Sequence, residues 1–357
     1  MSNEVQRGGG GRRWVPRGPM VEWRRLAFRP RSTLPPPLDG PGVRLYGYGR
    51  QALRDGLLAL GLRQGDNVLV PSVICRSALQ PFESLGVGLR TYQVDERLRP
   101  CLDHAGSLAD AGTRAILAVH YFGFPQDPRP IQDFARRQGL AFIEDNTHGF
   151  LGRHGDRWLG TFGDIAIFSF RKTLPLPNGA ALLLNRPDLV LPPARPRAAP
   201  ARDLVAFALR DGVRRVETMI HRDLVTWLRE ADEGEHPPDR ADVVPGHDGV
   251  GYSRVADALA RRMDLEAEGR IRRDSCRFWL ERAGAWAAWG AAPVFGDLPP
   301  GTVPYGLPVW VRDRSGFMAA MRRENVSCFS WPDRPMPAPL PALAVIPLHR
   351  HPTGESA

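Results

Sequence analysis

Lysine is nearly absent from this 357-residue sequence. Lysine and arginine together number 48, and Lys172 is the only lysine among them. An amine can lose its proton and condense with an aldehyde, whereas a guanidinium stays charged and cannot replace it in that reaction. Lys172 follows the apolar run at 165–170 and precedes the turn at 177–179. A compositional bias could leave one lysine by chance, but its place at the end of a predicted strand favours a chemical role.

Cysteine is scarce too, and long apolar runs are missing. The four cysteines (Cys75, Cys101, Cys276 and Cys328) form no CxxC pair. This favours a reduced protein and argues against a metal site such as zinc. No run of eighteen apolar residues occurs, so no membrane span is expected. The first 19 residues lack the apolar segment of a secretory signal, and we therefore expect a cytoplasmic protein.

The net charge of +9 raises the question of nucleic-acid binding. The arginines are spread along the chain, and no helix-turn-helix, zinc finger or aromatic-basic RNA motif accompanies them. No nucleic-acid partner is expected. Attraction of an anionic substrate such as a nucleotide diphosphate is another possible use of the charge.

Short apolar runs alternate with helical patterns from residue 46 onwards. Such alternation is typical of an α/β domain with a largely parallel sheet. We expect a basic Gly/Pro-rich arm over 1–40 and a large domain over 41–250, with an insert near 187–249 that contains a helix over 201–228. A smaller α+β domain is expected over 251–357, beginning with one long helix from 253 to about 282.

Four kinds of polar group stand at the predicted strand ends. A carboxylate (Asp145), a hydroxyl (Ser169) and an amine (Lys172) follow strands, while Gly49 and Arg50 open the first helix. Ligands of open α/β sheets bind at the carboxyl ends of the strands. The set matches the needs of pyridoxal phosphate: a helix N-terminus for the phosphate, a carboxylate for the ring nitrogen and an amine for the aldehyde. Singly, each residue could instead be a cap, a core hydroxyl or a surface group.

Several motifs resemble the DegT/DnrJ/StrS family of pyridoxal-phosphate-dependent sugar aminotransferases over roughly residues 45–350. They are GDNVLVPS at 65–72, VHYFGFPQD at 119–127, IEDNTH at 143–148, LGTFGDIAIFSF at 159–170 and IPLH at 346–349. The block from 143 to 170 is the specific part. The resemblance implies the aspartate aminotransferase type of fold (fold type I), with a large mixed or parallel sheet and a smaller C-terminal α+β domain. It also implies a homodimer, because that fold completes its active site across a two-fold interface.

The resemblance implies roles for individual residues. Lys172 would hold pyridoxal 5′-phosphate as an imine and move protons. Asp145 would pair with the pyridine nitrogen, and His148 would contact the phenolic oxygen. Ser169 would bind the phosphate, with Gly49 and Arg50 at the family's Gly-Thr phosphate turn.

The sequence also departs from the family pattern. The family lysine lies five residues after the serine, where this chain has Leu174, while Lys172 lies three after Ser169. A two-residue deletion between serine and lysine restores the match. Cys75 stands near the position of the aromatic residue that stacks on the pyridine ring. The family's G-Y-N-Y-R-M segment is not found in GYSRV at 251–255.

Two functions follow as hypotheses. In the first, an amino acid such as glutamate or glutamine gives its nitrogen to a nucleotide-linked keto-sugar through the Lys172 imine, in the biosynthesis of a polysaccharide or natural product. A dehydratase variant of that chemistry is disfavoured, because such relatives carry histidine in place of the lysine. In the second, the chain is a non-catalytic member that binds pyridoxal phosphate or a sugar nucleotide as a sensor or partner subunit.

Overall fold

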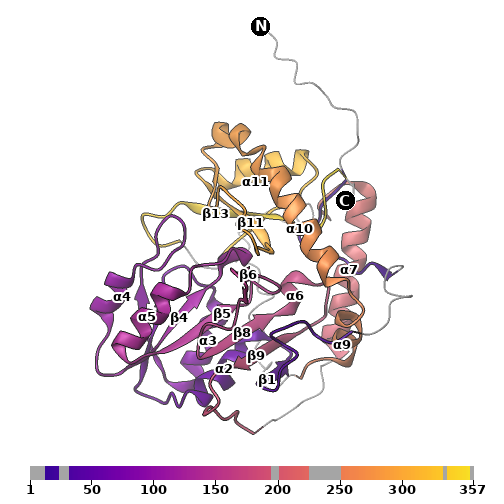
Figure 1. Cartoon of the computed structure of the whole chain (residues 1–357). Helices are drawn as coiled ribbons and strands as arrows, with labels where there is room; N and C mark the ends of the chain where they lie inside the picture. Colours follow the sequence, from indigo (N-terminus) through magenta and orange to yellow (C-terminus); the bar gives the residue numbers. More distant parts are fainter. Residues whose placement is uncertain (1–12, 24–31, 194–200, 225–250, 333–335, 354–357) are drawn as a thin grey trace.

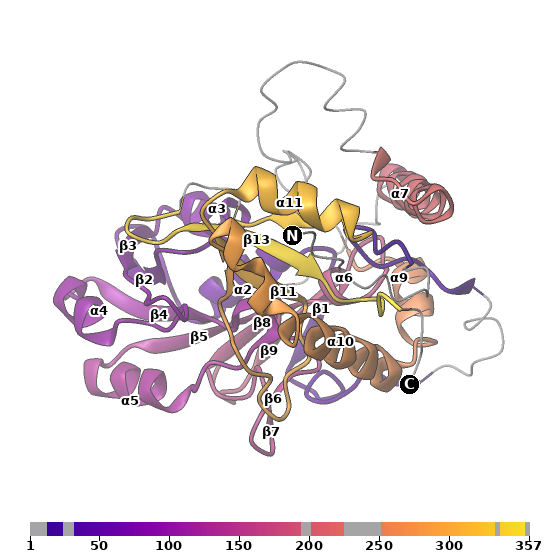
Figure 2. The ribbon, with the colours of Figure 1, turned by 90° about the horizontal axis from the view of Figure 1, so that it is seen from above.

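The computed structural model describes residues 13–23, 32–193, 201–224, 251–332 and 336–353. Two sheets organise this part of the chain, with helices packed around them (Figures 1 and 2). Within it, no helix is both long enough and apolar enough to cross a membrane. The same residues contain no cluster of three or more His, Cys, Asp or Glu side chains that could hold a metal ion.

The larger sheet has seven strands and is mostly parallel. In spatial order they are β1 (Val43–Tyr46), β9 (Ala180–Leu184), β8 (Ile165–Ser169), β5 (Ala141–Asn146), β4 (Thr113–Val119), β2 (Asn67–Pro71) and β3 (Gly88–Tyr92). Only β9 runs against its neighbours, pairing antiparallel with both β1 and β8. The central strands are buried, as their continuous apolar sequences predict.

Helices connect the parallel strands. They are α2 (Gly49–Ala59), α3 (Arg76–Leu85), α4 (Leu102–Leu108) and α5 (Arg129–Gln138), with a 3₁₀ turn η1 (Tyr121–Gly123), a short helix α6 (Phe170–Thr173) and a hairpin of β6 (Arg153–His154) and β7 (Arg157–Trp158). Helices α3 and α5 both end at a glycine with positive φ, Gly86 at 65° and Gly139 at 66°. Glycine adopts this conformation without the steric cost of a side chain and so ends each helix before the next strand.

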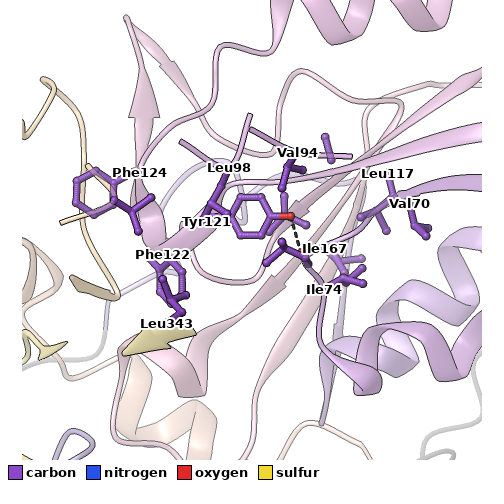
Figure 3. Packing of buried hydrophobic residues seen from close by; sticks show 14 of the residues in the cluster. Val70, Ile74, Val94, Leu98, Leu117, Tyr121, Phe122, Phe124, Ile167 and Leu343 are labelled. Atoms are coloured by element: carbon purple, nitrogen blue, oxygen red, sulfur yellow. Dashed lines mark hydrogen bonds between the residues drawn. The ribbon is translucent and has the colours of Figure 1, made fainter. Parts of the chain in front are cut away.

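The second sheet is antiparallel and lies in the C-terminal part of the chain. Its strands are β10 (Ala292–Pro293), β11 (Gly306–Val311), β13 (Ala342–Pro347) and β12 (Phe329–Ser330), accompanied by η3 (Ala283–Trp289) and α11 (Arg314–Arg323). One apolar core joins the two sheets, because Leu117 of β4 and Leu343 of β13 belong to the same buried cluster. Figure 3 shows part of this core, in which Tyr121 donates a hydrogen bond to the carbonyl of Val73 at 2.6 Å.

The long helix expected over 253–282 is two helices, α9 (Arg254–Ala260) and α10 (Leu265–Leu280). Each has its own N-cap: the Ser253 hydroxyl accepts from Ala256 N, and the Asp264 carboxylate accepts from Ala267 N. An Asp cap in the middle of the segment satisfies the free N–H groups of a new helix, so the chain turns there. The single-helix prediction missed this second cap.

The expected arm and insert are described only in part. Residues 1–12, including the glycine run at 8–11, lie outside the described residues. Trp14 and Val15 are buried, and Val15 forms a parallel bridge with Val326. In the insert, α7 runs over Ala201–Ile220, and the predicted helix positions 225–228 lie outside the described residues.

Candidate active site

The polar residues singled out in the sequence collect at one edge of the larger sheet. Asp145 and Asn146 end β5, and Ser169 ends β8 beside it. Across the antiparallel strand β9, Ala180 pairs with Ser169 on one side and with Tyr46 on the other. The end of β1 therefore lies at the same edge, and the turn that starts α2 follows directly. Sheet register alone brings the three chain segments together.

Lys172 lies on α6, close to the end of β5. Its Nζ donates a hydrogen bond to Thr147 Oγ1 at 3.3 Å, and Thr147 N donates to Asp145 Oδ1 at 2.9 Å. Leu174, at the family's usual lysine spacing, is 1% exposed and packs in an apolar cluster with Phe170. In this chain position 172 contacts Thr147 at the end of β5, and position 174 lies in the core.

The two adjacent carboxylates of β5 have different surroundings. Successive strand residues point to opposite faces of the sheet. Glu144 is fully buried and accepts hydrogen bonds from His120 Nε2 at 2.9 Å, Phe162 N at 2.9 Å and Gly163 N at 3.0 Å, with Gly160 N as a further donor. Burial raises the pKa of the Glu144 carboxyl, but these hydrogen bonds outweigh it and hold the pKa below its usual value. Glu144 is bound within the fold, which leaves Asp145 as the carboxylate of the site.

His148 is enclosed by aromatic rings. Its imidazole stacks on Tyr305 with ring centroids 5.1 Å apart and meets the Trp331 ring edge-on at 5.3 Å. Burial, reinforced by the charge of Lys172, lowers the pKa of His148 well below its usual range. The neutral ring accepts from Phe122 N through Nδ1 at 3.3 Å. Nε2 therefore carries the proton and can donate.

Cys75 belongs to the same group. Burial raises the pKa of its thiol; the charge of Lys172 opposes that shift and Asp145 adds to it. The sulfur lies 3.3 Å from Ser77 Oγ at the start of α3. The residue that stands near the family's stacking aromatic is thus within electrostatic range of both proposed site residues, but it has no ring.

Two arginines, Arg50 at the start of α2 and Arg171 on α6, lie near the ring of Tyr48. The guanidinium carbon of Arg50 lies 4.7 Å from the Tyr48 ring centroid, and that of Arg171 lies 5.7 Å from it. The Tyr48 hydroxyl donates to Asp203 of α7 at 2.8 Å. Burial and this hydrogen bond raise the pKa of Tyr48 to about 12, so the phenol stays protonated. Two cations and a helix N-terminus form an anion-attracting corner.

Gly49 and Ser169 complete this corner. A Cβ on Gly49 would meet Thr147 Cγ2 at 3.5 Å and the Phe168 carbonyl at 3.9 Å, so the turn lies directly against the ends of β5 and β8. Ser169 is 4% exposed, and its hydroxyl makes no hydrogen bond to another described residue. A buried hydroxyl in this position is available to a ligand. The donor set of amine, carboxylate, neutral imidazole, hydroxyl and two guanidinium groups fits pyridoxal phosphate.

Sequence reasoning missed three residues that the fold adds to this group: Thr147, Tyr48 and Arg171. Thr147 lay within the quoted IEDNTH motif, and Arg171 directly precedes the only lysine. Both residues are sequence neighbours of predicted site residues, Thr147 of His148 and Arg171 of Lys172, and this proximity was the signal that could have identified them. The Tyr48–Asp203 hydrogen bond joins residues 155 positions apart, and no local sequence pattern predicts it.

Comparison with known proteins bears on this geometry. Residues 47–190 match the model of the DegT/DnrJ/EryC1/StrS aminotransferase family. The family resemblance is confirmed over this part of the chain. The matched region holds all six residues proposed from the sequence for the site.

Two curated relatives match over part of the chain. The chain is 31% identical over 140 residues to GDP-perosamine synthase of Escherichia coli O157:H7, covering 38% of each chain. It is 33% identical over 155 residues to dTDP-4-dehydro-2,3,6-trideoxy-D-glucose 4-aminotransferase of Saccharopolyspora spinosa, covering 43% of this chain and 40% of the relative. The matches thus span about two fifths of the length of these curated relatives.

Solved structures extend the likeness to most of the chain. An aminotransferase from Psychrobacter cryohalolentis superposes with a TM-score of 0.61 at 19% identity, covering 89% of this chain and 84% of that one. The sugar aminotransferase CalS13 from Micromonospora echinospora gives 0.60 at 17% identity, with 93% of each chain covered. The predicted α/β fold of the aspartate aminotransferase type is confirmed.

Proposed function

We propose that this protein is a pyridoxal-phosphate-dependent aminotransferase. It would transfer an amino group from an amino acid, glutamate or glutamine, to a nucleotide-linked keto-sugar. The observation that carries the proposal is the position of the only lysine: Lys172 Nζ lies at the site edge, hydrogen-bonded to Thr147 Oγ1 at 3.3 Å, while Leu174 is in the core.

Each proposed residue has a distinct task. Lys172 would hold the cofactor through its amine and later act as the base that moves a proton. Asp145 would pair with the pyridine nitrogen, and neutral His148 would donate from Nε2 to the phenolic oxygen. Gly49, Arg50 and Ser169 would bind the phosphate, with Arg171 as an additional cation. When bound, pyridoxal phosphate supplies an electron sink for cleavage of a bond at the substrate carbon.

Thr147 would position the catalytic amine. Its backbone N–H is fixed on Asp145 at 2.9 Å, and its hydroxyl accepts from Lys172 at 3.3 Å. This arrangement links the carboxylate and the amine through one residue. It would keep Nζ at the site edge whether or not the amine is attached to the cofactor.

The substrate class rests on the named relatives. A GDP-perosamine synthase and a dTDP-sugar 4-aminotransferase both act on nucleotide-linked sugars by their names. The net charge of +9 would favour a diphosphate-bearing substrate. A homodimer and a cytoplasmic location remain predictions of the sequence.

A non-catalytic binding role is the alternative. It is favoured by Cys75, which cannot stack on a pyridine ring, and by Arg50 in place of the family threonine. In that case the site would bind pyridoxal phosphate or a sugar nucleotide without turnover.

The deciding experiment uses the single lysine. Purified protein is incubated with pyridoxal phosphate, and its visible absorption is recorded before and after borohydride reduction, followed by peptide mass spectrometry. A visible band that reduction converts into a phosphopyridoxyl group on Lys172, followed by glutamate-dependent loss of that band in unreduced protein, supports the aminotransferase. A labelled Lys172 without any response to amino donors would favour the binding protein. No band in the wild type, or the same band in Lys172→Ala, would contradict the Lys172 imine and favour the alternative, a protein that binds pyridoxal phosphate or a sugar nucleotide without turnover.

A further inference from the structure

Arg272 of α10 is a cation enclosed within the protein. The residue is 1% exposed, and burial of a charge costs free energy unless hydrogen bonds or an opposite charge compensate it. Its Nη1 donates to the carbonyls of Tyr305 at 3.1 Å and Pro304 at 3.4 Å, and its Nη2 donates to the carbonyl of Thr173. Burial lowers the pKa of the Arg272 guanidinium, and the charge of Glu268 opposes that shift. The guanidinium therefore binds backbone oxygens of two segments that lie far apart in the sequence.

The first of these segments carries the only lysine. Thr173 is the last residue of α6 and directly follows Lys172. The last carbonyls of a helix have no partner within it, so a donor from elsewhere must satisfy them. Arg272, 99 positions along the chain, is such a donor for the Thr173 carbonyl. It thereby fixes the end of the short helix that contains Lys172.

The second segment leads to His148. The ring of Tyr305 stacks on the His148 imidazole with centroids 5.1 Å apart. The backbone N–H of Tyr305 donates to the Phe122 carbonyl at 2.7 Å, and Phe122 N donates to His148 Nδ1 at 3.3 Å. Tyr305 therefore orients the imidazole both through its ring and through the backbone. Arg272 binds the carbonyl of that same tyrosine.

We propose that Arg272 is a positioning residue that sets where the Lys172 amine lies relative to the His148 imidazole. It holds the end of α6 and the segment at 304–305 on one guanidinium. Because Lys172 and His148 act on one cofactor only in the proposed function, this role rests on that function. The hydrogen bonds of Arg272 go to backbone oxygens, so it acts through its neighbours and not on the substrate.

The geometry of this bridge requires an arginine. A guanidinium has five N–H donors in a rigid planar fork, so its two outer nitrogens can bind carbonyls of different segments at once. A lysine has a single nitrogen on a flexible stem and cannot replace the fork. The Nε of Arg272 is buried and has no hydrogen-bond partner among the described residues. The hydrogen bonds that compensate the buried charge are therefore those of the two outer nitrogens.

A purely structural role and a positioning role differ in their kinetic consequences. A purely structural bridge would stabilise the fold, and its loss would leave kcat of the folded enzyme unchanged. A positioning bridge also places the reacting groups, and a small misplacement of such groups slows the chemical step. Its loss should lower kcat while KM changes little, since the substrate contacts remain.

The test compares two variants of α10. Arg272→Met keeps a long unbranched side chain and removes every donor, and methionine is preferred to lysine because a second amine would complicate labelling of a chain with one lysine. Cys276→Ser is the matched control, because Cys276 is buried one turn later in the apolar core. Both variants should melt at a lower temperature. Well below those temperatures, only Arg272→Met should lose kcat, by about 10–100-fold, with KM within about threefold of wild type.

Hydrogen exchange tests the bridge without any cofactor. The amide of Leu174 donates to the Phe170 carbonyl at 2.7 Å, within the segment that ends α6. The amide of Tyr305 donates to Phe122 at the same distance. In Arg272→Met both amides should exchange about tenfold faster or more relative to the amides of the central strand β4, as expected when a hydrogen bond from a charged donor is lost. Cys276→Ser should not show this local change.

Unchanged exchange at either amide, or a kcat of Arg272→Met within about twofold of that of Cys276→Ser, would overturn the proposal. If Arg272→Met does not fold, Arg272→Gln, which retains one amide donor, takes its place with the same expected pattern. Absence of an imine on Lys172 in wild type would instead contradict the proposed function. Exchange would then still decide whether Arg272 holds both segments: faster exchange at both amides supports the bridge, and unchanged exchange overturns it.

Discussion

Lys172 Nζ and Thr147 Oγ1 lie 3.3 Å apart and form the contact that ties α6 to the end of β5. The backbone N–H of Thr147 also donates a hydrogen bond to Asp145 Oδ1 at 2.9 Å. Asp145 and Thr147 come from the IEDNTH motif at 143–148, which the sequence analysis singled out. Lys172 lies three residues after Ser169, where the family pattern has a spacing of five.

Thr147→Val should slow the reaction without removing the cofactor. The valine keeps the shape but cannot accept from Lys172, and one hydrogen bond of this kind contributes about 0.5–1.5 kcal/mol, so kcat should fall by roughly two- to tenfold. The pH dependence of kcat should shift as well, since Lys172 loses a partner. Thr161→Val is the control, because the Thr161 hydroxyl donates to the Trp158 carbonyl at 2.7 Å, outside the site. Equal kcat and pH profiles for Thr147→Val and wild type would contradict a positioning role.

Lys172→Ala should abolish the visible band and lower turnover by at least about 10²–10⁴-fold, the typical contribution of a catalytic proton carrier. Moving the lysine to the family spacing should not restore it. In the double variant Lys172→Ala/Leu174→Lys, the new amine would enter the cluster that holds Leu174 at 1% exposure. That variant is expected to melt at a lower temperature and to show no borohydride-fixed label. A label on position 174 would show that the loop can adopt the usual family geometry.

Asp145→Asn and Glu144→Gln should separate function from stability. Asp145→Asn removes the charge proposed for the ring nitrogen and should lower kcat by about 10²-fold with little change in melting temperature. Glu144→Gln removes the acceptor of several buried hydrogen bonds and should cost about 1–3 kcal/mol of unfolding free energy. Denaturant titration and steady-state kinetics on both variants test this. A loss of stability in Asp145→Asn together with a loss of kcat alone in Glu144→Gln would show that Glu144, and not Asp145, is the carboxylate that acts in the reaction.

Stability should fall in acid, in two ranges. The pKa of Glu144 is held below its ordinary value of 4.5, so its contribution is present above that value and is lost as pH falls through the lower folded-state pKa. The pKa of His148 is lowered from 6.5, so below that value the unfolded chain takes up a proton that the folded chain does not. Stability should therefore begin to fall below about pH 6.5.

Melting temperatures measured between pH 7 and pH 5 should fall less steeply in His148→Gln than in wild type. His349 also has a lowered pKa from burial, so a remaining slope is expected. Identical slopes for wild type and His148→Gln would show that His148 is not buried in its neutral form.

The two arginines around Tyr48 should set the affinity for pyridoxal phosphate. Arg50→Ala and Arg171→Ala should each weaken binding by about 10–100-fold, as expected for hydrogen bonds between charged groups. Arg54→Ala is the matched control, because Arg54 is on the same helix, 44% exposed, and pairs with Asp55. The measurement is a titration of the visible band, repeated with pyridoxal, which lacks the phosphate. Equal losses for pyridoxal and pyridoxal phosphate would place the arginines elsewhere than at the phosphate.

The sequence by itself determined the alternation of strands and helices, the family resemblance, which the family model matches over residues 47–190, and the identity of the single lysine. These features are local: apolar runs form buried strands, and polar residues that follow them must lie at the carboxyl edge of a parallel sheet. Asp145, Ser169 and Lys172 could be named for that reason. The break between α9 and α10 was local too, and the Asp264 cap was the signal that the prediction overlooked.

Tertiary structure decided the rest, because it depends on contacts between distant positions. Whether residue 172 or 174 faces the site follows from which side chain the apolar cluster around Phe170 accepts. Burial among Tyr305 and Trp331, far along the chain, keeps His148 neutral. The outward apolar face of α7 follows from acidic residues that find their partners in Tyr48 and Val21. A hydrophobic pattern alone would have turned that helix the other way, since burial of its apolar side would ordinarily be favoured.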